Sequence, residues 1–184
     1  MGSAADGIDT PRTRIAPLRP TDADFVVALL NAPSFLRFIG DRGVRDRADA
    51  LRWIAQGPMA SHARHGFGLD RVALRDDGTP IGICGLLRRD GLDAPDLGFA
   101  FLEPWQGRGF GRECAAAVLR DAHRRLGLDR VLAVVAPGNV ASLALLARLG
   151  FAAAGVWRAP AGGDLLHRLE WTAAHGLRAL ARLA

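Results

Sequence analysis

The stretch that decides the fold runs from Asp96 to Arg112 and reads DLGFAFLEPWQGRGFGR. Its first part, residues 97–102, is apolar and predicts a strand that ends at the following Glu-Pro pair. Three alternate glycines come next, and from residue 112 to 126 apolar residues recur at helical spacing. A strand, a glycine-rich turn and a helix N-terminus present free backbone N–H groups and the positive end of the helix dipole to one point. That point suits a phosphate.

Several phosphate-binding classes can be set aside from composition and spacing. All 24 basic residues are arginine, so the chain has no lysine for a Walker-type loop, a kinase site or a pyridoxal Schiff base. A dinucleotide-binding loop would need Gly-x-Gly-x-x-Gly, whereas the glycines here stand at 107, 109 and 111. The spacing therefore disfavours a Rossmann site.

Two segments carry a resemblance to a known family. Residues 106–111, Gln-Gly-Arg-Gly-Phe-Gly, resemble the pyrophosphate loop of the GNAT acetyltransferases, whose pattern is Gln/Arg-x-x-Gly-x-Gly/Ala. Residues 131–151, VLAVVAPGNVASLALLARLGF, resemble the strand and helix that follow in that family, with Asn-x-x-Ser before the helix and Leu-Gly-Phe at its end. The alternative for the first segment alone is a tight strand-to-helix turn without a ligand. The two segments in the family's order favour membership.

The order of predicted elements agrees with the fold that this resemblance implies. The elements are a strand at 12–18, helices across 21–65 interrupted at Gly57-Pro58, a hairpin at 67–88, the strand 97–102, a helix at 112–126, a strand at 130–136, a helix after Asn139, strands at 151–158 and 165–171, and a helix at 173–184. We predict an α+β (mixed α/β) domain at 12–184 after a flexible leader at 1–11. The implied GNAT acyl-CoA N-acyltransferase fold has a mostly antiparallel twisted sheet of about seven strands flanked by helices.

Composition restricts the partners. The net charge of +5 could indicate an acidic partner, but 24 basic residues stand against 19 acidic ones, without an arginine stripe interleaved with aromatics. We favour a mixed solvated surface over nucleic-acid or ribosome contact. Cys84 and Cys114 lie in apolar stretches without metal-ligand spacing, so no metal is expected. Since the cysteines indicate no disulfide framework, we expect a reducing cytoplasm, and without an apolar run of 18 residues or an apolar signal core we expect no membrane association. A monomer and a homodimer both stay open.

The resemblance implies an enzyme, an acetyl-CoA-dependent N-acetyltransferase (an acyltransferase). It would transfer the acetyl group to a primary amine, on a protein N-terminus or a small molecule, by direct attack in a ternary complex. Loop amides would bind the pyrophosphate, the opened strand edge at 99–102 the pantetheine arm, and the helical region 31–66 would form a wall of the acceptor site. The predicted residues that bind acetyl-CoA are Phe101, Leu102, Gln106, Gly107, Arg108, Gly109, Phe110, Gly111, Arg112 and Asn139.

The catalytic groups depart from the commonest family pattern. Many members carry a Tyr seven residues after the equivalent of Asn139; that position is Leu146 here, and the chain has no Tyr. The ribosomal-protein N-acetyltransferase branch (RimJ/RimL-like) shares that lack and has Ser at the position of Ser142, which makes Ser142 the candidate for hydrogen bonding the departing sulfur. Asp96 stands where this branch often carries Glu, and is the candidate base, acting through a water. A packing or capping Ser and a strand-start carboxylate are the alternatives.

Other readings stay open at this point. His65 and His167 are further candidates to reach the acceptor site, although a lone His is usually structural. Because the Tyr is missing, a non-catalytic coenzyme A-binding or regulatory module of the same fold remains an alternative function. A third class, an arginine-rich nucleic-acid binder, would show affinity that falls steeply with salt.

Overall fold

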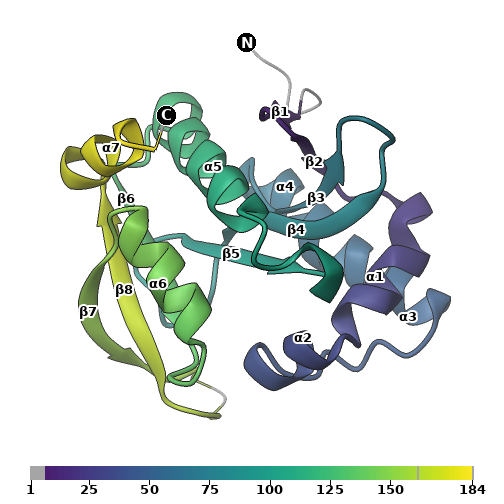
Figure 1. Cartoon of the computed structure of the whole chain (residues 1–184). Helices are drawn as coiled ribbons and strands as arrows, with labels where there is room; N and C mark the ends of the chain where they lie inside the picture. The colour runs from purple at the N-terminus through teal and green to yellow at the C-terminus, as the bar shows by residue number, and fades with distance from the viewer. Residues whose placement is uncertain (1–6, 161, 184) are drawn as a thin grey trace.

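The computed structural model describes residues 7–160 and 162–183. Its centre is an eight-stranded sheet in the order β1-β2-β3-β4-β5-β6-β8-β7 (Figure 1). The strands are β1 (Ile8–Asp9), β2 (Thr13–Pro17), β3 (Leu69–Leu74), β4 (Pro80–Leu87), β5 (Asp96–Phe101), β6 (Arg130–Val135), β7 (Ala152–Trp157) and β8 (Leu166–Thr172). Neighbouring strands are antiparallel, except that β5 and β6 are parallel. The predicted mostly antiparallel sheet is confirmed.

The additional strand is β1, which lies in the segment for which the sequence predicted a flexible leader. Ile8 and Asp9 pair with Ile15 and Arg14 of β2, and Arg14 Nη1 lies 3.0 Å from Asp9 Oδ1. Two residues are too few for an alternating hydrophobic pattern, so sequence periodicity misses this strand. Residues 1–6 of that segment lie outside the described residues.

Helices cover both faces of the sheet (Figure 1). They are α1 (Ala23–Leu30), α2 (Pro33–Phe38), α3 (Arg47–Ile54), α4 (Ala60–His65), α5 (Phe110–Leu126), α6 (Val140–Arg148) and α7 (Ala173–Ala181). Cys84 and Leu86 of β4 belong to the core cluster that includes α5, whereas Ile83, the residue before Cys84, belongs to the cluster of α1 and α3. This alternation is the period of two expected for a strand that is buried on both faces.

The helical region between β2 and β3 is interrupted where the sequence predicted. A π-helical turn, Ala55–Met59, joins α3 to α4 and contains Pro58. Proline has no N–H to donate and its ring clashes with the preceding turn, so the regular bonding pattern must break there. The two short helices that result form a bent layer beside the central strands.

The parallel strands β5 and β6 diverge almost at once. Their pairing in the described chain consists of one Cα pair, Asp96 with Leu132, next to a hydrogen bond of 2.9 Å from Leu132 N–H to Pro95 O. Beyond this pair the sheet opens, and α2 and α6 lie on either side of the opening (Figure 1). The split leaves backbone groups of β5 facing a gap that a ligand can enter.

Candidate active site

The glycine loop between β5 and α5 has the geometry of an anion-binding turn. Gly107 (φ 70°) and Gly109 (φ 84°) adopt the left-handed conformation that favours glycine. The helix begins at Phe110, two residues earlier than predicted, and Glu113 N–H donates to Gly109 O at 3.1 Å. The N–H groups of residues 110–112 precede this hydrogen bond, so they are free to bind a ligand.

The residues that carry these amides line a cavity of about 620 Å³, here called the loop cavity. It lies between the loop, the end of β5, α2 and α6, and its basic side chains are Arg108, Arg112 and Arg148. None of the described residues that line it is Asp or Glu. Nine of the ten residues predicted to bind acetyl-CoA line this cavity. Backbone donors, a helix N-terminus and three guanidinium groups together favour a multiply charged phosphate ligand.

Leu102 is the exception. Its N–H donates to Ile81 O at 2.9 Å, and its side chain packs against the α1 and α3 cluster, away from the loop cavity. Hydrogen-bonded and non-bonded pairs alternate along antiparallel strands, so the register of β5 with β4 turns the N–H groups of Phe99 and Phe101 toward the opening. The prediction that Leu102 binds acetyl-CoA did not take this alternation into account, and Leu102 is the one of the ten residues that does not line the loop cavity.

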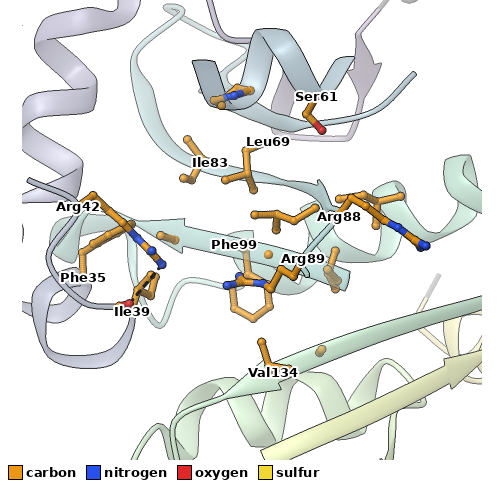
Figure 2. A pocket seen from close by; sticks show the side chains of 18 of the residues that line it. Phe35, Ile39, Arg42, Ser61, Leu69, Ile83, Arg88, Arg89, Phe99 and Val134 are labelled. Carbon is orange, nitrogen blue, oxygen red and sulfur yellow. Dashed lines mark hydrogen bonds between the residues drawn. The ribbon is translucent and has the colours of Figure 1, made fainter. Parts of the chain in front are cut away.

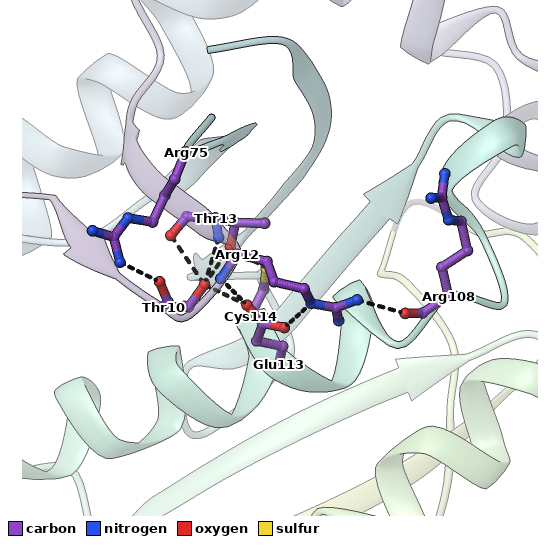
Figure 3. Close-up of polar contacts among 7 residues, drawn as sticks. All are labelled: Thr10, Arg12, Thr13, Arg75, Arg108, Glu113 and Cys114. Atoms are coloured by element: carbon purple, nitrogen blue, oxygen red, sulfur yellow. Dashed lines mark hydrogen bonds and ion pairs between the residues drawn. The ribbon is translucent and has the colours of Figure 1, made fainter. Parts of the chain in front are cut away.

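A polar network behind the loop fixes its position (Figure 3). Arg12 donates from Nε to Glu113 Oε2 at 2.7 Å and from Nη1 to Arg108 O at 3.1 Å. Thr10 Oγ1 donates to Glu113 Oε1 at 2.6 Å. Burial raises the pKa of Glu113, but the hydrogen bonds from Thr10 and Arg12 outweigh it and hold that pKa below its usual value. Thr10 and Arg12 therefore hold the loop and the first turn of α5 in position.

A second cavity of about 460 Å³, here called the wall cavity, lies on the other side of the opening. As expected, part of the helical region 31–66 lines it, together with β4, β5, β6 and α6. Figure 2 shows Phe35 and Ile39 at one side, Ser61 at another and Val134 below Phe99. The loop and wall cavities share Phe99, Ala100, Asn139 and Ser142 among their lining residues. Two molecules, one in each cavity, would meet at this junction.

Asn139 and Ser142 stand at the junction because of how α6 begins. Asn139 is the N-cap, and its Oδ1 accepts from Ser142 N–H at 3.2 Å. The cap uses the carbonyl oxygen, so the two donors on Asn139 Nδ2 remain for a ligand. Ser142 lines both cavities, and its hydroxyl makes no hydrogen bond to the described residues. Capping and ligand contact are thus compatible here.

Asp96 does not reach either cavity. Its side chain is fully buried at the strand split, and Arg89 donates from Nε to its Oδ2 at 2.7 Å. Burial raises the pKa of Asp96, and the charge and hydrogen bond of Arg89 counteract that rise. A carboxylate held in this way is not placed to accept a proton from an amine in the wall cavity. Asp96 instead orients Arg89, which does line that cavity, and the predicted base role through a water stays a prediction.

The two histidine candidates for the acceptor site differ in position. His65, stacked on Phe67 with ring centroids 5.6 Å apart, lines the wall cavity. His167 is exposed on β8 and lines neither cavity. Residues 7–160 and 162–183 contain no group of three or more His, Cys, Asp or Glu arranged to hold a metal ion. No helix among them is both long and apolar enough to cross a membrane.

A split sheet with a glycine loop at a helix N-terminus is the arrangement of the acyl-CoA N-acyltransferase fold. The family described as Acetyltransferase (GNAT) domain matches residues 12–152. The chain belongs to the GNAT acetyltransferase family.

Relatives and solved structures agree with this assignment. The uncharacterized N-acetyltransferase YnaD of Bacillus subtilis is 26% identical over 87 residues, 47% of this chain, and the match spans about half (51%) of that relative's length. RimJ of Mycobacterium smegmatis, solved in complex with CoA-disulfide, superposes with a TM-score of 0.80 at 19% identity, covering 100% of this chain and 97% of that one. An acetyltransferase from Agrobacterium tumefaciens gives a TM-score of 0.76 at 23% identity over 91% and 96%. Both likenesses are of fold.

Proposed function

We propose that the chain transfers an acetyl group from acetyl-CoA to a primary amine, on a protein N-terminus or a small molecule, by direct attack in a ternary complex. The observation that carries the proposal is the junction of the two cavities at the split between β5 and β6. A thioester in the loop cavity and an amine in the wall cavity would approach each other there without a covalent enzyme intermediate. Such positioning alone can supply much of the rate enhancement.

Coenzyme A fits the loop cavity through contacts of three kinds. The amides of residues 107–112 would bind the pyrophosphate, with charge-assisted contacts from Arg108 and Arg112. Asn139 Nδ2 would donate to a pantetheine carbonyl. The outward-facing N–H of Phe99 would donate to the thioester oxygen, where negative charge develops during attack.

The reaction forms a C–N bond, breaks the C–S bond and moves one proton from the amine to the thiolate. Ser142, which lines both cavities, would hydrogen bond the departing sulfur. None of the described residues lining the wall cavity is a carboxylate, so the amine must reach its neutral form through solvent or through His65. A protein α-amine, with a pKa of about 8, needs less help than a lysine amine at about 10.4. This favours an α-amine or another weakly basic acceptor.

The test is calorimetric titration of acetyl-CoA into the purified protein, followed by a thiol-release assay with a panel of amines and N-terminal peptides. We expect one-to-one binding and release that depends on the acceptor. Binding without release on any acceptor would instead support a coenzyme A-binding module. Absence of binding would remove the assignment of the loop cavity.

A further inference from the structure

The charged side chains that line the wall cavity are all positive. Its lining includes Arg42, Arg64, Arg88 and Arg89, and none of its described lining residues is Asp or Glu. The whole chain, by contrast, has 19 acidic residues against 24 basic ones. A concave site lined by one sign of charge concentrates the field and attracts ligands of the opposite sign. Like the loop cavity, the wall cavity therefore differs in charge from the mixed composition of the chain as a whole.

Arg89 is held ready for a ligand by the buried Asp96. The ion pair uses Arg89 Nε, which leaves both terminal nitrogens of the guanidinium for other partners. Asp96 is fully buried, whereas 28% of the Arg89 side chain remains exposed. The ion pair with Asp96 therefore fixes the position of Arg89, which lines the cavity and keeps two terminal nitrogens free.

Arg42 approaches the same part of the cavity from the opposite side (Figure 2). Its Nη2 lies 3.4 Å from Ile39 O, and it forms no ion pair with a described carboxylate. The neighbouring Asp41 is engaged by Arg45 instead. Burial, and to a lesser extent the charge of Arg89, lower the pKa of Arg42. The two guanidinium groups thus repel each other, and an anion bound between them would relieve this repulsion.

The phosphates of coenzyme A do not need these side chains. The loop cavity has its own arginines, Arg108, Arg112 and Arg148, on the far side of the junction. The arginines of the wall cavity are therefore available to the acceptor. Because Asp96 offsets one of the two charges, the net charge of the Arg42 and Arg89 pair is near that of one cation, which one carboxylate would neutralise.

We infer that the acceptor is an amine that carries a carboxylate, and that Arg42 and Arg89 bind this carboxylate while the amine reaches the junction at Ser142. The inference rests on the proposed function and names its substrate class. The carboxylate can come from a free amino acid or from an acidic side chain near a protein N-terminus. Planar guanidinium groups match a carboxylate by paired hydrogen bonds in either case.

The test compares acceptors that differ only in this group. One pair is the C-terminally amidated peptides Ser-Glu-Ala and Ser-Gln-Ala, and the other is β-alanine and β-alaninamide, with each KM expressed for the neutral amine because the amide lowers the amine pKa. We expect the carboxylated member of at least one pair to have a KM lower by about 10- to 100-fold at similar kcat, as a charge-assisted contact would give. The pair that responds identifies the source of the carboxylate.

Arg42→Gln is the decisive variant. Arg89→Gln would leave Asp96 buried without its partner and is expected to destabilise the fold, whereas Arg42 has no ion pair to lose. Arg42→Gln should remove most of the KM preference. The matched control is Arg37→Gln, since Arg37 is exposed on α2, rests on Phe38 and does not line the wall cavity. The control should keep the preference.

The outcomes separate the inference from the proposed function. Turnover with equal KM for both members of both pairs would overturn the inference and leave the acetyltransferase assignment standing. A preference that survives in Arg42→Gln, or a stronger preference for phosphoethanolamine over ethanolamine, would also overturn it. No turnover with any amine would overturn both.

Discussion

Arg12 and Glu113 are 101 residues apart in the sequence, yet Arg12 Nε lies 2.7 Å from Glu113 Oε2. The pair joins the segment before β2 to the first turn of α5. The same guanidinium donates to Arg108 O, and its Cζ lies 4.2 Å from the centroid of the Phe110 ring. One arginine thus connects the start of the chain to the proposed pyrophosphate loop.

Glu113→Ala should destabilise the protein and weaken coenzyme A binding together. The change removes an acceptor used by Thr10 Oγ1 and by both the backbone and the side chain of Arg12. We expect a loss of about 1–3 kcal/mol in the free energy of unfolding, as for charged hydrogen bonds of this kind. Chemical denaturation and calorimetry measure the two effects. Asp9→Asn, which breaks an exposed ion pair with Arg14, is the control and should change stability by under about 1 kcal/mol.

The same carboxylate predicts a pH dependence. The folded pKa of Glu113 lies below its usual value, so the folded state binds fewer protons than the unfolded state as this group titrates. Its stabilisation is complete above the unfolded pKa of about 4.3 and is lost as pH falls through the folded pKa. The difference in unfolding free energy between wild type and Glu113→Gln should therefore narrow below about pH 4. A constant difference across this range would argue against the linkage.

Gly109→Ala should lose coenzyme A affinity beyond any loss of stability. Gly109 has φ 84° at the N-terminus of α5, and Gly127 has φ 65° at its C-terminus. Each alanine would hold a left-handed conformation at a cost of about 1–2 kcal/mol. Gly127→Ala is thus a matched control for strain on the same helix, far from the loop cavity. Equal coenzyme A affinities in the two variants would show that the loop does not bind the cofactor.

Both cysteines should resist alkylation in the folded protein. Cys84 and Cys114 are fully buried; burial raises the pKa of Cys114 to about 11 and that of Cys84 well above its usual value. The thiolate is the reactive form, so iodoacetamide at pH 8 should label neither until denaturant unfolds the chain. Mass spectrometry over time measures this. Rapid native labelling of Cys114 would show that its thiol is accessible in the folded protein, contrary to the packing role that its apolar surroundings indicate.

The structural features that depend only on neighbouring residues could be predicted from the sequence. The loop glycines, the break at Pro58 and the cap at Asn139 each follow from local conformational rules, and the structure has all three. Contacts between distant segments were missed. No local pattern links Arg12 to Glu113, and the role predicted for Asp96 depended on whether its side chain would face a cavity or Arg89. That choice is made by the packing of the strand split, which periodicity does not describe.

Ser142→Ala tests the proposed proton or hydrogen-bond donor to sulfur. The N-cap bond uses Ser142 N–H and Asn139 Oδ1, so removing the hydroxyl should leave α6 capped and the melting temperature nearly unchanged. We expect kcat to fall by about 10- to 1,000-fold, the range for one transition-state contact or proton donor, with acetyl-CoA affinity retained. Asn139→Ala is the contrasting variant, because it removes the cap at a cost of about 1 kcal/mol and also the proposed pantetheine contact. If Ser142→Ala kept full kcat, water rather than this hydroxyl would protonate the leaving thiolate, and Ser142 would be a lining residue of the junction without a catalytic role.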